Sequence, residues 1–255
     1  MTQWSSGEIY ESYVGRWSRL VAADFVSWLD QHTGLRWLDV GCGTGALTST
    51  ILRTADPASV LGVDASAGFI EHARQHVRDE RASFEVRSAT ELPDGPYDAV
   101  VAGLVLNFVP ERAEALRRMR EIGSTVGAYV WDYAEGMQLM RNFFDAMIEV
   151  RPQDREHDEA VRFPFCTAEG LEGLFTEAGF TTVSTRAVVV PTEFTSFDDY
   201  WRPFLGGQGP APAYLRSLPE PDQETLREAV RARLPIEADG SIRLTARAWA
   251  AKAVS

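Results

Sequence analysis

The chain has 255 residues, of which 45% are hydrophobic and 24% are charged, and its formal net charge is −12. This length suits one large α/β domain, and the average composition excludes a disordered chain. A nucleic-acid partner needs a clustered basic surface, whereas the arginines here are scattered, so we expect no nucleic acid to bind.

Further classes are excluded by what the sequence lacks. No apolar run reaches the roughly 18 residues that cross a bilayer, and no basic segment precedes an apolar core as in a signal peptide. Cys42 and Cys166 offer neither a disulfide framework nor metal-ligand spacing. We therefore expect a cytoplasmic monomer or homodimer without a bound metal or a membrane contact.

The first predicted element is a short helix near residues 10–17. Tyr10, Tyr13, Val14 and Trp17 would share one face of it, because they follow helical spacing. This aromatic face either docks on the core or covers a ligand site.

Short apolar runs then alternate with helical patterns, which indicates βαβ units and a parallel sheet. The expected strands are residues 35–40, 60–64, 83–86, 97–102 and 125–131, and the expected helices are residues 45–53, 67–80 and 112–121.

The pattern changes after the fifth strand. Predicted helices cover residues 137–150, 167–178 and 222–234, and predicted strands cover residues 181–190 and 242–254. Residues 151–165 form a charged connection, and residues 191–240 form a long one that contains an aromatic group. Connections of that length within a compact domain are usually lids or binding elements.

A glycine-rich turn, LDVGCGTG at residues 38–45, joins the first strand to its helix. Such a turn presents backbone N–H groups at a helix N-terminus, which suits a nucleotide-like cofactor. Residues 41–46 also satisfy the G-x-G-x-x-A pattern of nicotinamide sites, with Asp64 about twenty residues on. The Tyr-x-x-x-Lys pair of short-chain dehydrogenases is impossible, however, because Lys252 is the only lysine.

Several motifs together resemble the class I, Rossmann-like S-adenosylmethionine-dependent methyltransferases of the small-molecule type. They are WLDVGCGTGALT at 37–48, LGVDAS at 61–66, SATELP at 88–93 and YDAVVAGLVLNFVP at 97–110, with YESYVGRWSRL at 10–20 similar to the family's N-terminal cap. Their order over about a hundred residues is far more specific than one glycine turn.

The resemblance implies a Rossmann-like three-layer α/β sandwich with a seven-stranded, mostly parallel sheet. Its last strand would lie antiparallel between the fifth and the sixth. We expect a single domain over residues 1–255, with a helical cap (1–33), a cofactor-binding core (34–133) and two substrate-side lid insertions (134–166 and 191–240).

In such enzymes the glycine turn passes under the methionine part of the cofactor, Asp39 binds the methionine amino group and Asp64 accepts hydrogen bonds from both ribose hydroxyls. Ser88 stands where most relatives place an aspartate for the adenine amino group, and a serine hydroxyl carries no charge. The implied cofactor-binding residues are Tyr10, Arg16, Trp17, Asp39, Gly41, Cys42, Gly43, Asp64, Ala65, Ser66, Ser88, Ala89, Thr90, Gly103 and Leu104.

The acceptor is expected to be a small or medium-sized, partly apolar or aromatic molecule. The cofactor S-adenosylmethionine would leave as its product, S-adenosylhomocysteine. Alternatives are a methyltransferase that acts on protein or RNA, and a non-catalytic cofactor-binding protein. The expected substrate pocket consists of Tyr13, Asn107, Trp131, Tyr133, Arg141, Phe144 and Trp201.

A general base is needed only if the acceptor must lose a proton. Asp132, at the end of the fifth predicted strand, and Asn107 are the candidates for a catalytic residue. The alternative for Asp132 is a strand-end residue that caps the local backbone.

Overall fold

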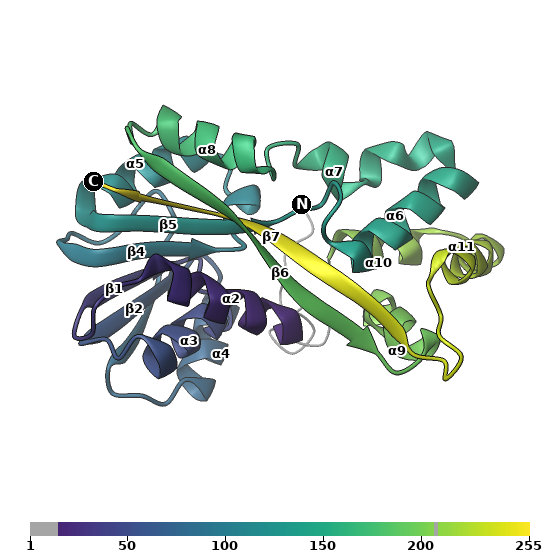
Figure 1. Cartoon of the computed structure of the whole chain (residues 1–255), viewed down its shortest axis with the longest axis horizontal. Coiled ribbons are helices and arrows are strands. Elements are labelled where there is room, and N and C mark those ends of the chain that lie inside the picture. Colours follow the sequence, from purple (N-terminus) through teal and green to yellow (C-terminus); the bar gives the residue numbers. More distant parts are fainter. Residues whose placement is uncertain (1–14, 207–208) are drawn as a thin grey trace.

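One seven-stranded sheet forms the centre of the molecule (Figure 1). The computed structural model describes residues 15–206 and 209–255, without the side chain of Arg16. The sheet order is β3-β2-β1-β4-β5-β7-β6. The strands are β1 (Arg36–Val40), β2 (Ser59–Asp64), β3 (Ala82–Val86), β4 (Tyr97–Gly103), β5 (Gly123–Trp131), β6 (Val183–Phe194) and β7 (Ile242–Val254).

Strands β1 to β5 pair in parallel, and β7 lies antiparallel between β5 and β6. This arrangement confirms the predicted sheet, including the position of its last strand. The chain runs outward from β1 to β3 and then returns to the other side of β1 as β4. Ligands of open α/β sheets bind at such a reversal, beyond the carboxyl ends of the strands.

Helices cover both faces of the sheet and make it the middle of three layers (Figure 1). One layer contains α2 (Arg16–Leu29), α3 (Ala46–Thr54) and α4 (Ala67–His76), and the other contains α5 (Arg112–Ile122) and α8 (Ala168–Glu177). The predicted start of α8 is confirmed, since the Thr167 side chain accepts the Gly170 N–H at 3.0 Å and caps the helix.

The β6–β7 ribbon continues beyond β5, and a group of helices surrounds its far end (Figure 1). They are α6 (Gln138–Val150), α9 (Phe197–Trp201), α10 (Pro210–Ser217) and α11 (Glu220–Arg233). Their shared core is aromatic: the Phe143 and Phe204 rings stack with centroids 4.6 Å apart.

Shorter elements connect these parts: η2 (Leu106–Phe108), η3 (Pro152–His157), α7 (Glu159–Arg162) and η4 (Arg202–Gly206). Neither these turns nor α9 and α10 were predicted from the sequence. The helix predicted over residues 67–80 ends at His76, because Val77 adopts an extended conformation (φ −95°, ψ 94°). None of the helices described is long and apolar enough to span a membrane.

Candidate active site

Gly41 and Gly43, in the turn between β1 and α3, both have a positive φ but differ in their surroundings. Gly41 has φ +71°, and a Cβ there would overlap the Val105 side chain. Gly43 has φ +53°, but a Cβ there would meet nothing within 4 Å. The turn is therefore packed tightly at Gly41 and has open space beside it at Gly43.

Asp64 is fixed at the end of β2 by two backbone groups. Its Oδ2 accepts the Gly43 N–H at 3.0 Å and its Oδ1 accepts the Ser66 N–H at 2.8 Å. A carboxylate has about four acceptor positions, so each oxygen keeps one for a ligand. Burial raises the pKa of Asp64, although both backbone hydrogen bonds oppose that rise.

Asp39 is fully buried near the end of β1 and has only one of its oxygens satisfied. Its Oδ2 accepts the Thr48 hydroxyl at 2.7 Å, whereas its Oδ1 has no hydrogen-bond partner among the described residues. Burial raises the pKa of Asp39 to about 7, and the charge of Asp64 adds to that rise. An unpaired carboxylate in this position would gain strongly from a cationic partner.

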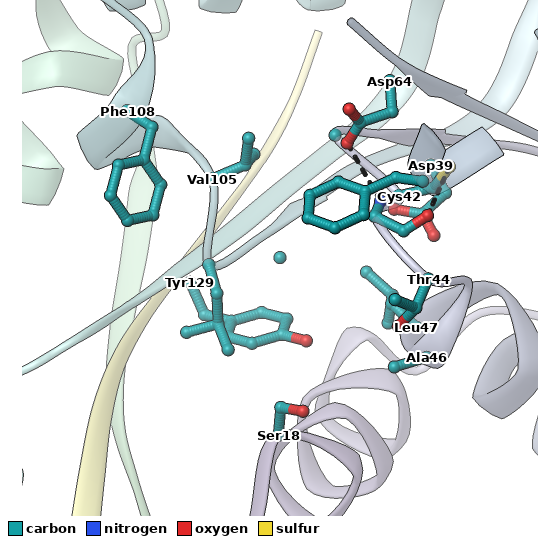
Figure 2. A pocket seen from close by; sticks show the side chains of 15 residues that line it. Ser18, Asp39, Cys42, Thr44, Ala46, Leu47, Asp64, Val105, Phe108 and Tyr129 are labelled. Atoms are coloured by element: carbon teal, nitrogen blue, oxygen red, sulfur yellow. Dashed lines mark hydrogen bonds between the residues drawn. The ribbon is translucent and has the colours of Figure 1, made fainter. Parts of the chain in front are cut away.

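Both carboxyl groups line one pocket at the carboxyl edge of the sheet. Figure 2 shows Asp39, Asp64 and Cys42 on one side of it and Phe108 and Val105 on the other. The lining residues are Ser18, Asp39, Gly41, Cys42, Gly43, Thr44, Ala46, Leu47, Asp64, Phe69, Gly103, Leu104, Val105, Phe108 and Tyr129.

Comparison with known proteins agrees with this geometry. A family model described as a methyltransferase domain matches residues 38–134, which contain β1 to β5 and the pocket's glycine turn. A demethylmenaquinone methyltransferase of Staphylococcus aureus (strain JH9) is 26% identical over 188 residues, covering 67% of this chain and 76% of the relative. Residues 38–134 therefore form a methyltransferase domain, and the relatives support a class I, S-adenosylmethionine-dependent enzyme.

Two solved structures show the same fold. A putative methyltransferase of Bacillus halodurans has a TM-score of 0.59 at 14% identity, over 91% of this chain and 97% of that one. Phosphoethanolamine N-methyltransferase 2 of Haemonchus contortus, solved in complex with S-adenosyl-L-methionine, has a TM-score of 0.60 at 16% identity, over 97% of this chain and 56% of that one.

Seven of the predicted cofactor-binding residues of this methyltransferase lie together on the pocket: Asp39, Gly41, Cys42, Gly43, Asp64, Gly103 and Leu104. The thiol of Cys42 packs in a small apolar cluster with Ile70, Ala73 and Phe84, and burial raises its pKa. A small, unreactive side chain is what this position accommodates.

Other predicted cofactor residues do not line this pocket. Ser66 caps α4 by accepting the Phe69 N–H at 3.3 Å, and Ala65 next to it is exposed. Ser88 accepts the Thr90 N–H at 3.2 Å in the turn after β3, with Ala89 between them. Their adenine contacts stay predictions.

Most of the N-terminal predictions cannot be compared with the structure. Tyr10, Tyr13 and the side chain of Arg16 lie outside the described residues. Trp17 is described, in the first turn of α2. It is buried and meets the Phe194 ring edge-on, with centroids 5.2 Å apart, so this ring packs on β6.

Eight lining residues were not predicted: Ser18, Thr44, Ala46, Leu47, Phe69, Val105, Phe108 and Tyr129. Six of them stood within motifs already singled out, namely the N-terminal segment 10–20, the glycine turn with its helix and the segment after β4. Phe69 and Tyr129 carry no such signal, because the fold alone brings α4 and β5 to the pocket.

An aromatic row leads from this pocket toward the predicted substrate side; it consists of Phe108, Phe163 and Tyr133. The Phe108 and Phe163 centroids are 5.7 Å apart and the Phe163 and Tyr133 centroids 5.6 Å apart. The Asn107 side-chain amide donates to the Tyr133 hydroxyl at 3.3 Å. Two predicted substrate residues, Asn107 and Tyr133, therefore lie together beside the pocket wall.

The other predicted substrate residues have packing or ion-pair contacts. Trp131 and Phe144 are buried in the core, and Trp201 stacks on Phe197. The Arg141 guanidinium donates to both oxygens of Asp158, at 3.0 and 2.8 Å. Their contact with an acceptor stays a prediction.

Asp132 is buried, and each of its oxygens already accepts hydrogen bonds. Oδ1 accepts the N–H groups of Ala134 and Glu135 at 3.2 and 3.1 Å, and Oδ2 accepts the Arg247 Nε at 2.6 Å. These contacts agree with the capping alternative, because a general base needs a free oxygen that can reach the substrate proton.

Proposed function

We propose that this methyltransferase transfers the methyl group of S-adenosylmethionine to a small, partly apolar or aromatic molecule bound beside Phe108. One observation carries the proposal: the Phe108 ring lines the pocket of Asp39 and Asp64, yet 46% of the residue is exposed. An apolar ring left open on a catalytic pocket favours an apolar ligand. The relative in Staphylococcus aureus, named for demethylmenaquinone, supports a small-molecule acceptor.

The pocket residues fit the cofactor. The unpaired Oδ1 of Asp39 would accept the cofactor's ammonium group, and the two remaining acceptor positions of Asp64 would take the ribose hydroxyls. The open space at Gly43 lets the turn approach the ligand without a side chain between them. When bound, the cofactor supplies a sulfonium whose methyl group is already electrophilic.

The protein must align the acceptor with the methyl group of the cofactor and exclude water from the reacting atoms. Leu104 lies just after β4 with φ +57°, and its N–H donates to the Tyr129 carbonyl at 2.8 Å, which fixes the backbone beside the pocket. Strained residues of this kind are often retained where a ligand must be clamped. Leu104, Val105 and Phe108 together give this wall an apolar surface, which helps to keep water from the reacting atoms.

The charge distribution supports a small acceptor over RNA. Many of the arginines described form ion pairs with carboxylates, for example Arg118 with Asp94 and Glu121. Paired guanidinium groups are not available for a phosphate backbone unless those pairs break. The net charge of −12 adds long-range repulsion.

The test is methyl transfer to a panel of phenols, hydroquinones and aromatic amines, measured as release of S-adenosylhomocysteine. We expect turnover with one of these classes. Phe108→Ala should lower kcat/KM by about tenfold, because a buried aromatic contact contributes on the order of 1.5 kcal/mol. Leu205→Ala, at an exposed apolar residue outside this pocket, is the matched control.

Labelled methyl transfer to total RNA or protein, with no turnover on the panel, would contradict the proposal. So would a Phe108→Ala variant that retains the full kcat/KM for the best small acceptor. Binding of S-adenosylhomocysteine without turnover on any of these substrates would favour the non-catalytic alternative.

A further inference from the structure

A buried acid lies outside the cofactor pocket, in the single-turn helix α7. Glu159 is 1% exposed, and its Oε2 has no hydrogen-bond partner among the described residues. A carboxylate is costly in such a place, whereas a neutral carboxyl group is tolerated. The packing around α7 is therefore compatible with only one protonation state of Glu159.

The charged and titratable groups around Glu159 do not compensate an ionised carboxylate. Burial raises its pKa to about 8; the charge of Asp158 adds to the rise, and that of Arg162 opposes it. Burial raises the pKa of Cys166, just beyond α7, to about 12, and the charge of Glu159 adds to that rise. The charges of Arg112 and Asp132 act on the same thiol with opposite signs.

Helix α7 is held at its start by α6 and contacts at its end a ring that lines the cofactor pocket. At its start Asp158 caps the Ala160 N–H at 2.9 Å and accepts two hydrogen bonds from Arg141 of α6. At its end Phe163 donates its N–H to the Glu159 carbonyl at 2.8 Å, and its ring contacts Phe108. A change in the position of α7 would thus reach the ring that lines the cofactor pocket.

None of the described residues covers the outer side of α7. Ala160 and Val161 line an open hollow of about 560 Å³, together with Glu135, Arg141 and Asp158, and Val161 is 47% exposed. A helix of one turn has no stability of its own, so tertiary packing and the contacts of Asp158 hold α7 in place. The hollow gives α7 room to move outward.

We propose that α7 is a proton-controlled latch on the acceptor side of the pocket, held closed by the neutral carboxyl group of Glu159. When Glu159 releases its proton to solvent, the carboxylate draws α7 toward water, and Phe163 leaves Phe108. The assignment of this side to the acceptor rests on the proposed function, but the movement itself does not.

Hydrogen exchange of the full chain tests the latch without any acceptor. Protection factors, corrected for the intrinsic effect of pH, are measured for the amides of Phe163 and Cys166 and for the segment of Phe108. We expect protection to fall by up to about tenfold per pH unit between about pH 5 and about pH 8, because in this window the open state has released the proton that the closed state keeps. Glu159→Gln should keep its protection, whereas Glu156→Gln, an exposed neighbour in η3, should behave like the wild type.

A protection factor that does not change with pH in the wild type would overturn the proposal. The same loss of protection in Glu159→Gln would also overturn it, and Glu159→Met serves as the neutral variant if the glutamine variant does not fold. If protection falls with pH as expected but the enzyme methylates no small molecule, only the proposed function is contradicted and the latch is still supported.

Discussion

At the scale of single residues, Asp39 and Asp64 are two acids in one pocket that are prepared for different partners. Backbone N–H groups orient both oxygens of Asp64, as suits a fixed acceptor of two hydroxyl groups. Asp39 instead keeps one buried oxygen that none of the described residues hydrogen-bonds, and burial raises its pKa to about 7. Cofactor binding should therefore depend on pH through Asp39.

We predict that the affinity for S-adenosylhomocysteine rises with pH up to about 7. Only the ionised Asp39 attracts an ammonium group, so below that pKa each pH unit should cost up to about tenfold in affinity. Above about pH 8 the ligand's α-amino group loses its proton, and affinity should fall again. Isothermal titration calorimetry between about pH 5.5 and about pH 9 measures this profile.

The Asp39→Asn variant should bind S-adenosylhomocysteine more weakly than the wild type. Its affinity should not rise with pH below about 7, because the amide does not titrate. Asp94→Asn, whose side chain is fully exposed, should retain the wild-type profile. A wild-type affinity that is constant from about pH 5.5 to about pH 8 would refute the role given to Asp39.

A second prediction concerns Asp64→Ala, which removes the acceptor of both ribose hydroxyls and the partner of the Gly43 N–H. Hydrogen bonds to a charged group contribute roughly 1.5–3 kcal/mol, so the Kd for S-adenosylhomocysteine should rise by about 10- to 150-fold. Asp94→Ala is the matched control. An unchanged Kd in Asp64→Ala would mean that the end of β2 does not hold the sugar.

Some of these residues could be predicted from the sequence because they belong to contiguous motifs. Asp64 ends one predicted strand and Asp39 is the last residue but one of another, and strand ends determine where a side chain lies relative to a parallel sheet. Tyr129 and Phe69 could not be found this way, because each faces the pocket only after β5 and α4 have packed. Asp132 was an obvious candidate by position, but its hydrogen bonds depend on Arg247 of β7, 115 residues away.

At the scale of elements, the β1–α3 turn is fixed by close packing against the segment after β4. We predict that Gly41→Ala costs more stability than Gly34→Ala. Both positions have a positive φ, so an alanine in the left-handed conformation should destabilise the fold by roughly 1–2 kcal/mol at either one. Only at Gly41 does the new methyl group overlap Val105, which adds about 1–3 kcal/mol of overpacking.

Urea unfolding of the two single variants measures the difference. The double variant Gly41→Ala with Val105→Ala should recover part of the loss, because alanine lacks the two Val105 methyl groups that the added Cβ would meet and keeps only the contact with the Cβ of residue 105 at 2.7 Å. Equal losses for Gly34→Ala and Gly41→Ala would show that backbone strain alone requires the glycine.

The elements that sequence patterns predicted are those that repeat a strand and an amphipathic helix. Their apolar runs are long enough to fix both type and position, as in β4, which is buried over most of its length. The unpredicted helices α7 and α9 have four and five residues. Elements this short contain little more than one turn, so tertiary contacts such as Arg141 with Asp158 decide where they form.

At the scale of the whole molecule, long-range contacts of β7 tie the methyltransferase core to its other parts. Lys252, the only lysine, donates to the Trp28 carbonyl at 2.7 Å and thereby links β7 to α2. Arg247 binds Asp132 and Glu135 and links β7 to the end of β5. The sequence contains these residues but not their pairing, because the partners lie far apart along the chain.

Buried acids also give the whole molecule a characteristic stability profile. Asp39 and Glu159 have folded-state pKa values of about 7 and about 8, against ordinary values of 3.8 and 4.5. Above pH 4.5 the unfolded chain releases both protons, while the folded chain keeps them until pH rises through the folded pKa values. The folded state therefore binds more protons across this window, and its stability falls as pH rises.

We predict that the free energy of unfolding decreases between about pH 5 and about pH 8, with an upper bound of about 1.4 kcal/mol per pH unit for each acid. Asp39 should contribute up to about pH 7 and Glu159 up to about pH 8. Asp79 does not offset this trend, because its lowered pKa of about 2 acts at lower pH. Urea unfolding at each pH measures the slope, which Asp39→Asn and Glu159→Gln should each reduce and Glu156→Gln should leave unchanged. S-adenosylhomocysteine should counteract the decrease, because its ammonium group favours the ionised form of Asp39. Stability that rises with pH in the wild type would show that neither acid keeps its proton in the folded chain.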